Sequence, residues 1–260
     1  MKEAIVRFLT TIMYFASHKY FTNYFVMDTQ KNDLSGIKLV LFDVYETLLN
    51  MDEVVRKVNN ILDSKRGYTI WFEMFMEYCF VDNCTVQFND FSSIAKATMK
   101  MAGKNMGKDV DDHDIKGVME LLKHSPLHED VQNGLSRLHS LNLRIAALTN
   151  SPQQIVLDRM ERTGLISYFE EVLSAEHVKK YKPSLDVYDW ACKKLKVQAD
   201  EVLLVSSHGW DIAGGANAGM QTAYMFQDKQ MLYPLAPKPN IICRNVNDLA
   251  AQLQPRNASK

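Results

Sequence analysis

The stretch IKLVLFDVYETLLN, residues 37–50, determines how the rest of this chain is interpreted. Residues 37–42 form a short, largely apolar run with β-branched side chains, which is typical of a strand buried on both faces. The run ends abruptly at Asp43. Ligands of open α/β sheets bind at the carboxyl ends of the strands, so Asp43 is a candidate nucleophile or metal ligand. A loop aspartate that caps a following helix is the alternative interpretation.

The composition is that of a soluble globular protein. Of the 260 residues, 47% are apolar and 23% are charged, enough for one large domain or a domain that carries an insertion. The 30 lysines and arginines balance 31 aspartates and glutamates, so neither nucleic acid nor an anionic membrane is expected as a partner. The cysteines lack CxxC spacing, which disfavours a zinc site or a disulfide framework and predicts a reducing, cytoplasmic location. They are Cys79, Cys84, Cys192 and Cys243.

Residues 1–33 precede the first predicted strand and are interpreted as an N-terminal extension. The uncharged run 8–17 is too short to cross a bilayer, and no clear small-residue cleavage site follows it. An interfacial amphipathic helix is one alternative for this region, and a true start at Met27 is another. We expect the extension to be dispensable for folding and activity.

Residues 51–125 show helical periodicity and no convincing strand, which predicts a helical cap domain. Asp90 and the segment Asp112 to Asp114 are expected to cap the last two of its helices. Most apolar side chains of these helices are assigned to packing. The apolar stripes that predict the four helices lie at residues 54–62, 70–79, 94–99 and 115–122.

Strands alternate with helices after about residue 128. This spacing predicts an α/β fold with a Rossmann-like, doubly wound parallel sheet. Residues 34–50 and 126–254 would form this core domain, and residues 51–125 would be inserted into it. The further predicted strands are residues 143–148, 171–173, 202–206 and 222–226. The predicted core helices are residues 131–141, 152–163, 185–195 and 248–253, and a segment at 213–219 connects two strands.

Polar groups stand where four of the predicted strands end. One such group means little, but four on parallel strands would converge on a single crevice. The four are Asp43 with Thr47, Thr149 with Asn150, Lys182 before Pro183, and the segment Ser206 to Asp211.

This order of motifs resembles the haloacid dehalogenase superfamily over residues 37–252. FDVYETLL is similar to its first motif, with Asp43 as the nucleophile, and LTNSP to its second, with Thr149 as the hydroxyl. YKPSLDVY is similar to the third motif, with Lys182, and SSHGWD to the fourth, with Asp211. Each motif alone is weak, whereas the four together are specific.

The residue two positions after the nucleophile separates the chemistries of this superfamily. Its phosphatases carry a second aspartate there as general acid and base, whereas this chain has Tyr45, a poor base near neutral pH. Phosphatases also usually have two acidic groups in the fourth motif, where SSHGWD offers only Asp211. Magnesium prefers a shell of several oxygen ligands, so phosphoryl transfer is the less favoured chemistry.

DxYxT, SSxxWD and YKPxxxVY are instead similar to the 2-haloacid dehalogenase branch, which needs no metal or other cofactor. The resemblance implies that Asp43 displaces halide from carbon 2 of a small anionic substrate and that water hydrolyses the resulting ester. Lys182 would keep Asp43 ionised, and Asp211 would position or activate the water. Members of this branch often form dimers, which leaves room for a homodimer here.

The resemblance also assigns the remaining site residues. Thr149 and Asn150 would bind the substrate carboxylate or orient Asp43, while Thr47 would act as a catalytic residue that holds the site geometry. A helix-capping role is the alternative for Thr47, and a core tyrosine is the alternative for Tyr188. The residues assigned to substrate binding are Tyr45, Thr149, Asn150, Tyr188, Ser206, His208 and Trp210.

Three positions depart from the dehalogenase pattern. Glu46 stands where these enzymes usually have glycine, and His208 stands where they have asparagine. Their cap helix carries an arginine after a tryptophan, whereas Trp71 is followed here by Phe72. The predicted function is hydrolytic dehalogenation of a small (S)-2-haloacid without a metal. The alternatives are a magnesium-dependent phosphatase and a catalytically silent binding protein of the same fold.

Overall fold

The computed structural model describes residues 34, 36–226 and 232–254. The predicted extension, residues 1–33, lies outside these described residues. The described residues from Gly36 onward form one compact unit. Among its described residues, no helix combines the length and the hydropathy of a membrane span.

Six parallel strands form the sheet, in the order β3-β2-β1-β4-β5-β6. The central strand β1 consists of four residues without measurable exposure and pairs with β2 on one side and β4 on the other. The predicted α/β class with a parallel sheet is therefore confirmed. The strands are β1 (Leu39–Phe42), β2 (Arg144–Thr149), β3 (Glu171–Ser174), β4 (Val202–Ser206), β5 (Gln221–Met225) and β6 (Ile241–Cys243).

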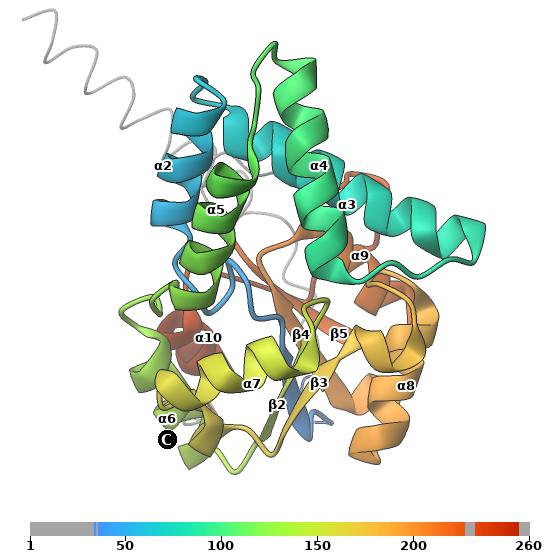
Figure 1. Ribbon diagram of the computed structural model, residues 1–260. Helices are drawn as coiled ribbons and strands as arrows, with labels where there is room; N and C mark the ends of the chain where they lie inside the picture. Colours follow the sequence, from blue (N-terminus) through green and yellow to red (C-terminus); the bar gives the residue numbers. More distant parts are fainter. Residues whose placement is uncertain (1–33, 35, 227–231, 255–260) are drawn as a thin grey trace, which may run out of the picture. The chain divides into compact units, whose positions relative to one another are not determined.

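Helices cover both faces of the sheet (Figure 1). Leu39 and Leu41 of β1 pack in one apolar cluster with α8, and alternation along a strand directs Val40 and Phe42 to the opposite face. α6 and α10 pack against each other, and both lie on the other side of the sheet from α8 in Figure 1. These helices are α6 (Val131–Ser140), α7 (Gln153–Arg162), α8 (Leu185–Leu195), α9 (Gly209–Asn217) and α10 (Val246–Leu253).

Four helices follow β1 and precede α6, in the segment that the sequence predicts to be a cap. α3 packs against α4, and α2 packs against both α3 and α5. Asp90 caps α4 as predicted, but the cap of α5 is Asp111, which lies just before the predicted segment. The assignment of these helices to a separate domain stays a prediction. They are α2 (Asp52–Ile61), α3 (Gly67–Thr85), α4 (Phe91–Asn105) and α5 (Asp112–His124).

Two elements differ from the sequence-based prediction. The segment 213–219, interpreted as a connection, belongs largely to helix α9, whose glycines give it a low intrinsic helix propensity. The three-residue strand β6 is too short for its pattern to be recognised. The glycines of α9 have a packing role, since a Cβ at Gly214 would lie 2.5 Å from the Tyr188 hydroxyl and 2.6 Å from Cβ of Pro183. Glycine therefore allows α9 to approach α8 closely.

We predict that Gly214→Ala destabilises the protein by about 1–3 kcal/mol, because the added methyl overpacks this contact. Gly117→Ala is the matched control, since a Cβ there meets only the flexible side chain of Lys57, at 3.3 Å. It is expected to be neutral or to stabilise α5 by up to about 1 kcal/mol. Urea denaturation measures both changes, and equal effects of the two substitutions would contradict the argument.

Candidate active site

The site forms at the carboxyl ends of β1, β2 and β4. Phe42 of β1 lies in register with Ala147 of β2 and Val205 of β4, so Asp43 leaves the sheet between its two neighbours. The backbone N–H of Asp43 donates to the carbonyl of Val205 at 2.9 Å. The strand order reverses at β1, and this is where ligands bind in open α/β sheets. The side chains after these strands therefore share one crevice.

Lys182 is completely buried between two carboxylates. Its ammonium donates to Oδ1 of Asp43 at 2.9 Å, to Oδ2 of Asp211 at 2.7 Å and to the carbonyl of Leu148 at 2.9 Å. Burial alone would lower the pKa of Lys182, but the charges of Asp211 and Asp43 outweigh it and raise this pKa. All three ammonium hydrogens have acceptors, so Lys182 is a fixed cation.

Burial also opposes ionisation of Asp43, yet its carboxylate is the stable form. Burial tends to raise the pKa of Asp43, but the charge of Lys182 and hydrogen bonds from His208 and Lys182 hold it well below its usual range. Thr47 adds a donor to Oδ2 at 2.9 Å, and the backbone N–H of Ser207 in turn donates to Thr47 at 3.0 Å. Asp43 is therefore an anion that is held in one orientation.

Asp211 is turned toward the protein interior. Its Oδ1 accepts a hydrogen bond from the Tyr188 hydroxyl at 2.7 Å, and its Oδ2 accepts from Lys182. Asp211 has no exposed surface and is not among the residues that line the cavity described below. Burial is the main cause that raises the pKa of Tyr188, which therefore stays a donor to Asp211.

His208 connects Asp43 to Glu46. Its Nδ1 lies 3.1 Å from Oδ2 of Asp43, and its Nε2 lies 2.9 Å from Oε2 of Glu46. Tyr68 of α3 donates to Oε1 of the same glutamate at 2.6 Å. Burial would lower the pKa of His208, but the two carboxylates outweigh it and raise this pKa to about 10. His208 is thus an imidazolium at neutral pH, and both of its N–H groups donate.

Glu46 has a backbone conformation that suits glycine. Its φ is 61°, in the left-handed region that is costly for a residue with a side chain. Sequence reasoning offers no role for this glutamate, and the structure supplies one as the partner of His208 and Tyr68. Two departures from the dehalogenase pattern, Glu46 and His208, are therefore one interacting pair.

The remaining predicted residues lie around this centre. Asn150 uses its amide to fix the backbone of Lys182, donating to the carbonyl at 3.3 Å and accepting from the N–H at 2.8 Å. The Ser206 hydroxyl accepts from the backbone N–H of His208 at 3.1 Å. Thr149 accepts from the N–H of Ser151 at 3.2 Å. Through these contacts Asn150 fixes the backbone at Lys182, and Ser206 fixes the backbone at His208.

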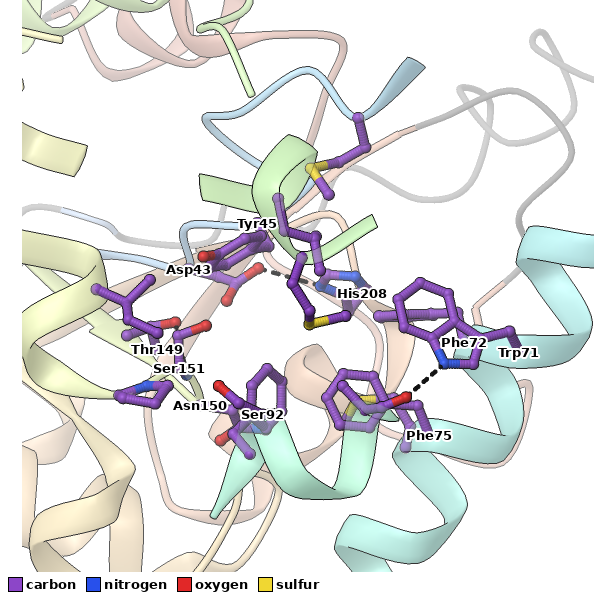
Figure 2. Close-up of a pocket in the computed structure, with 18 of the residues that line it drawn as sticks. Asp43, Tyr45, Trp71, Phe72, Phe75, Ser92, Thr149, Asn150, Ser151 and His208 are labelled. Carbon is purple, nitrogen blue, oxygen red and sulfur yellow. Dashed lines mark hydrogen bonds and ion pairs between the residues drawn. The ribbon is translucent and has the colours of Figure 1, made fainter. Parts of the chain in front are cut away.

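A cavity of about 280 Å³ opens in front of Asp43 (Figure 2). Figure 2 shows Asp43, Tyr45 and Thr149 on one side of it and the α3 aromatics on the other. Trp210 also lines the cavity and stacks on His208 with ring centroids 5.0 Å apart. The aromatic residues that line it are Tyr45, Tyr68, Trp71, Phe72, Phe75, Phe91 and Trp210.

Phe72 occupies the place where the resemblance implies an arginine. Its ring stacks on His208 with centroids 5.6 Å apart, and it also stacks on Tyr68 at 5.7 Å. No arginine is among the described residues that line the cavity. Arg159 of α7 lies behind the wall and is 2% exposed. Its guanidinium has no hydrogen-bond partner among the described residues and lies 5.1 Å from the ring centroid of Tyr45. Sequence analysis gives no sign of this buried cation.

The donor set does not fit a magnesium ion. Lys182 occupies the space between Asp43 and Asp211, where an ion shared by these carboxylates would lie. The carboxylate oxygens that do not contact Lys182 are engaged as well. Oδ2 of Asp43 contacts Thr47 and His208, and Oδ1 of Asp211 accepts from Tyr188. Magnesium requires a near-octahedral oxygen shell, and these contacts would have to break to form one.

The raised pKa of His208 predicts how stability depends on pH. Because this pKa rises from 6.5 to about 10 on folding, the stabilisation by protonated His208 is complete below pH 6.5 and is lost as the pH approaches 10. The groups that face the ring are the carboxylates of Asp43 and Glu46 and the rings of Phe72 and Trp210. The difference in unfolding free energy between the wild type and His208→Gln should therefore shrink over this pH range.

Urea denaturation at several pH values measures this difference, and ¹⁵N NMR of the imidazole gives the protonation state directly. A His208 that is neutral at pH 8 would contradict the assignment. Glu46→Gln should lower the pKa of His208, since it removes one of the two carboxylates. His113, an exposed histidine on α5, serves as the internal reference in the same spectra.

Comparisons with known proteins identify the family. Residues 37–219 match the model of the haloacid dehalogenase-like hydrolases. An (S)-2-haloacid dehalogenase of Pseudomonas putida is 20% identical over 84% of this chain and 96% of its own length. The (S)-2-haloacid dehalogenase 4A of Burkholderia cepacia is 26% identical over 73% of this chain and 83% of its own length.

Solved structures share the fold. The L-2-haloacid dehalogenase of Xanthobacter autotrophicus, with chloropropionic acid covalently bound, has a TM-score of 0.75 and is 21% identical. The match covers 85% of this chain and 99% of that one. The L-2-haloacid dehalogenase RSc1362 has a TM-score of 0.79 at 22% identity, over 84% and 99% of the two chains. Because the family model matches residues 37–219, which include strands β1 to β4 and the residues of the site, the chain belongs to the haloacid dehalogenase-like hydrolases.

Proposed function

We propose that this protein hydrolyses the carbon–halogen bond of 2-haloacids through an ester of Asp43 and without a metal. The observation that carries the proposal is the ionised Asp43, fixed by Lys182 at the polar end of a largely apolar cavity. A carboxylate in this setting can act as a nucleophile. Tyr45 lines the cavity where phosphatases of the superfamily have their acid-base aspartate. The two other carboxylates of the described centre, Glu46 and Asp211, are engaged by His208 and Lys182. The curated relatives named (S)-2-haloacid dehalogenase support the same chemistry.

In the first half-reaction, Oδ1 of Asp43 attacks carbon 2 of the substrate. From the described part of the chain, Oδ1 accepts one hydrogen bond, from Lys182, whereas Oδ2 accepts two. Oδ1 therefore keeps a lone pair for the attack. The new carbon–oxygen bond forms as the carbon–halogen bond breaks, and the bonding electron pair leaves with the halide. The product is an ester of Asp43, which no longer carries a charge.

In the second half-reaction, we assign activation of water to His208. Asp211, the residue that the sequence resemblance implies for this step, has both oxygens engaged and does not reach the cavity. His208 lines the cavity, contacts the nucleophile and is oriented by Glu46, which is the arrangement of a nucleophile, a base and an orienting acid. Asp211 retains the role of holding Lys182.

Ester formation itself prepares His208 to act as a base. The anionic Asp43 is one of the two groups that raise the pKa of His208, and its charge disappears in the ester. The imidazolium can then release its proton to solvent and accept one from the attacking water. That proton passes to the departing alkoxide, giving the 2-hydroxy acid. The second proton of the water leaves the new carboxyl group of Asp43 for His208, which restores both the carboxylate and the imidazolium. One proton and one halide are released for each molecule of substrate.

Two assays on the purified protein test the proposal. One measures halide release from 2-chloropropionate in EDTA, and the other measures phosphate release from an aryl phosphate with magnesium. We expect halide release only, reduced by Asp43→Asn on the order of 10⁴-fold. Asp112→Asn, at an exposed position of α5, is the control and should have no effect. Magnesium-dependent phosphate release without halide release would favour a phosphatase, and silence in both assays would favour a binding protein.

The role of His208 gives a separate prediction. In His208→Gln the side chain can still hydrogen-bond Asp43, so the first halide should be released in a burst, while steady-state turnover falls by about 10²–10⁴-fold. The ester should accumulate and appear as a mass increase on the peptide that contains Asp43. Tyr68→Phe keeps His208 and Glu46 and should not trap the ester. If the amplitude of the halide burst and the rate of steady-state turnover fall equally in His208→Gln, the histidine does not act on the second step.

A further inference from the structure

The cavity is larger than a three-carbon acid requires. Its volume of about 280 Å³ approaches the lower end of the roughly 300–1,000 Å³ that clefts for drug-sized ligands span. Asp43 and Thr149 stand at one end, where the proposed reaction takes place, and His208 lies between Asp43 and Phe72 with contacts to both. A short haloacid at this end would leave most of the cavity to water. The rest of the volume therefore selects the substrate.

The far wall is apolar and comes from the predicted cap. α3 contributes Trp71, Phe72 and Phe75, which face the cavity from the side opposite Asp43 in Figure 2. Further apolar side chains come from α3 itself, from the neighbouring cap helices α4 and α5, and from α7 of the predicted core. Among them are Met76 of α3, Phe91 and Ala95 of α4, Met119 and Leu122 of α5, and Ile155 of α7.

This wall is rigid and preformed. Trp71 stacks on Phe75 with centroids 5.9 Å apart and an interplanar angle of 12°, and Phe75 packs on Phe91 at 4.4 Å. The indole N–H of Trp71 donates to the carbonyl of Ala95 at 3.1 Å, which ties α3 to α4. Rings held in this way cannot collapse into the cavity, so the space is available to a ligand. Their faces and edges are suited to another aromatic ring.

The groups that are available to bind a substrate also favour one with a large apolar part. Because no arginine lines the described cavity, a short haloacid lacks the bidentate anchor that a guanidinium gives a carboxylate. Burial of an apolar arm would replace that anchor, since each buried methylene increases affinity about fourfold. Lys96 and Lys123 line the cavity and are exposed, so they place positive charge at its edge. The site is thus suited to an acid with a large apolar arm.

We propose that the substrates are 2-haloacids with an aryl group on carbon 3 or beyond, such as 2-halo-3-arylpropionates. The halogenated carbon lies at Asp43, and the ring lies against the wall formed by Trp71, Phe72 and Phe75. This inference rests on the proposed dehalogenation for its chemistry and on the cavity for its specificity, and the two parts are tested separately.

Halide release from 2-bromo-3-phenylpropionate is compared with release from 2-bromopropionate. We expect kcat/KM to be at least tenfold higher for the phenyl compound, mainly through a lower KM. An equal or lower value would overturn the inference while the proposed function stands. Should neither compound release halide, the function fails, and binding then tests the cavity alone. In that case 3-phenylpropionate should quench tryptophan fluorescence at a concentration at least tenfold lower than propionate, and equal concentrations would overturn the inference.

A variant that fills part of the cavity tests where the aryl group of the substrate binds. Ser92 lines the cavity near the start of α4 and has no role in the proposed chemistry. Ser92→Phe should lower kcat/KM for the phenyl substrate at least tenfold and leave that for 2-bromopropionate within twofold. Ala97→Phe on the exposed side of the same helix is the control and should change neither value. If Ser92→Phe does not fold, as judged by circular dichroism, Ser92→Leu replaces it. Equal losses for both substrates would overturn the placement.

Discussion

The site depends on one buried ammonium. Lys182 satisfies Asp43 and Asp211 at once, and both carboxylates would be unstable in this interior without it. Removing one partner from a buried pair of this kind leaves an uncompensated charge and costs about 3–5 kcal/mol. The same contacts keep Asp43 ionised and aim it at the cavity. Stability and reactivity thus have a common origin in this cluster, and the loops after β1, β4 and β3 must stay in register to maintain it.

Glu46 and His208 extend this balance of charges. The described centre contains three carboxylates, including Asp211, and two cations, one of which is the imidazolium of His208. A glutamate alone would add negative charge beside Asp43, and a cationic histidine alone would compete for Asp43. Together they neutralise each other, and Tyr68 connects the pair to α3. The left-handed backbone of Glu46 is the conformational cost of this arrangement.

Much of the fold is predictable because its signals are local. Fully buried strands such as β4 appear as apolar runs, and parallel strands bring their polar ends together, so Asp43, Lys182 and Asp211 could be grouped from order alone. Contacts between side chains that are distant in the sequence leave no such local pattern. Nothing in the spacing of Glu46 and His208, which are 162 positions apart, shows that they meet. Helix α9 was not predicted because its glycines have a low helix propensity. They are needed instead for the close contact between α9 and its neighbours.

The distribution of charge is compatible with the anionic substrate that we propose, even though the cavity wall is apolar. The cations nearest Asp43, Lys182 and His208, are already paired with carboxylates, and Phe72 covers one face of the imidazolium. Arg159 is different, since its guanidinium has no hydrogen-bond partner within the described part of the chain and lies against the ring of Tyr45, which lines the cavity. A buried charge is screened far less than an exposed one. Arg159 therefore contributes positive potential through the wall without occupying the cavity, and the space that a contacting arginine would fill stays open.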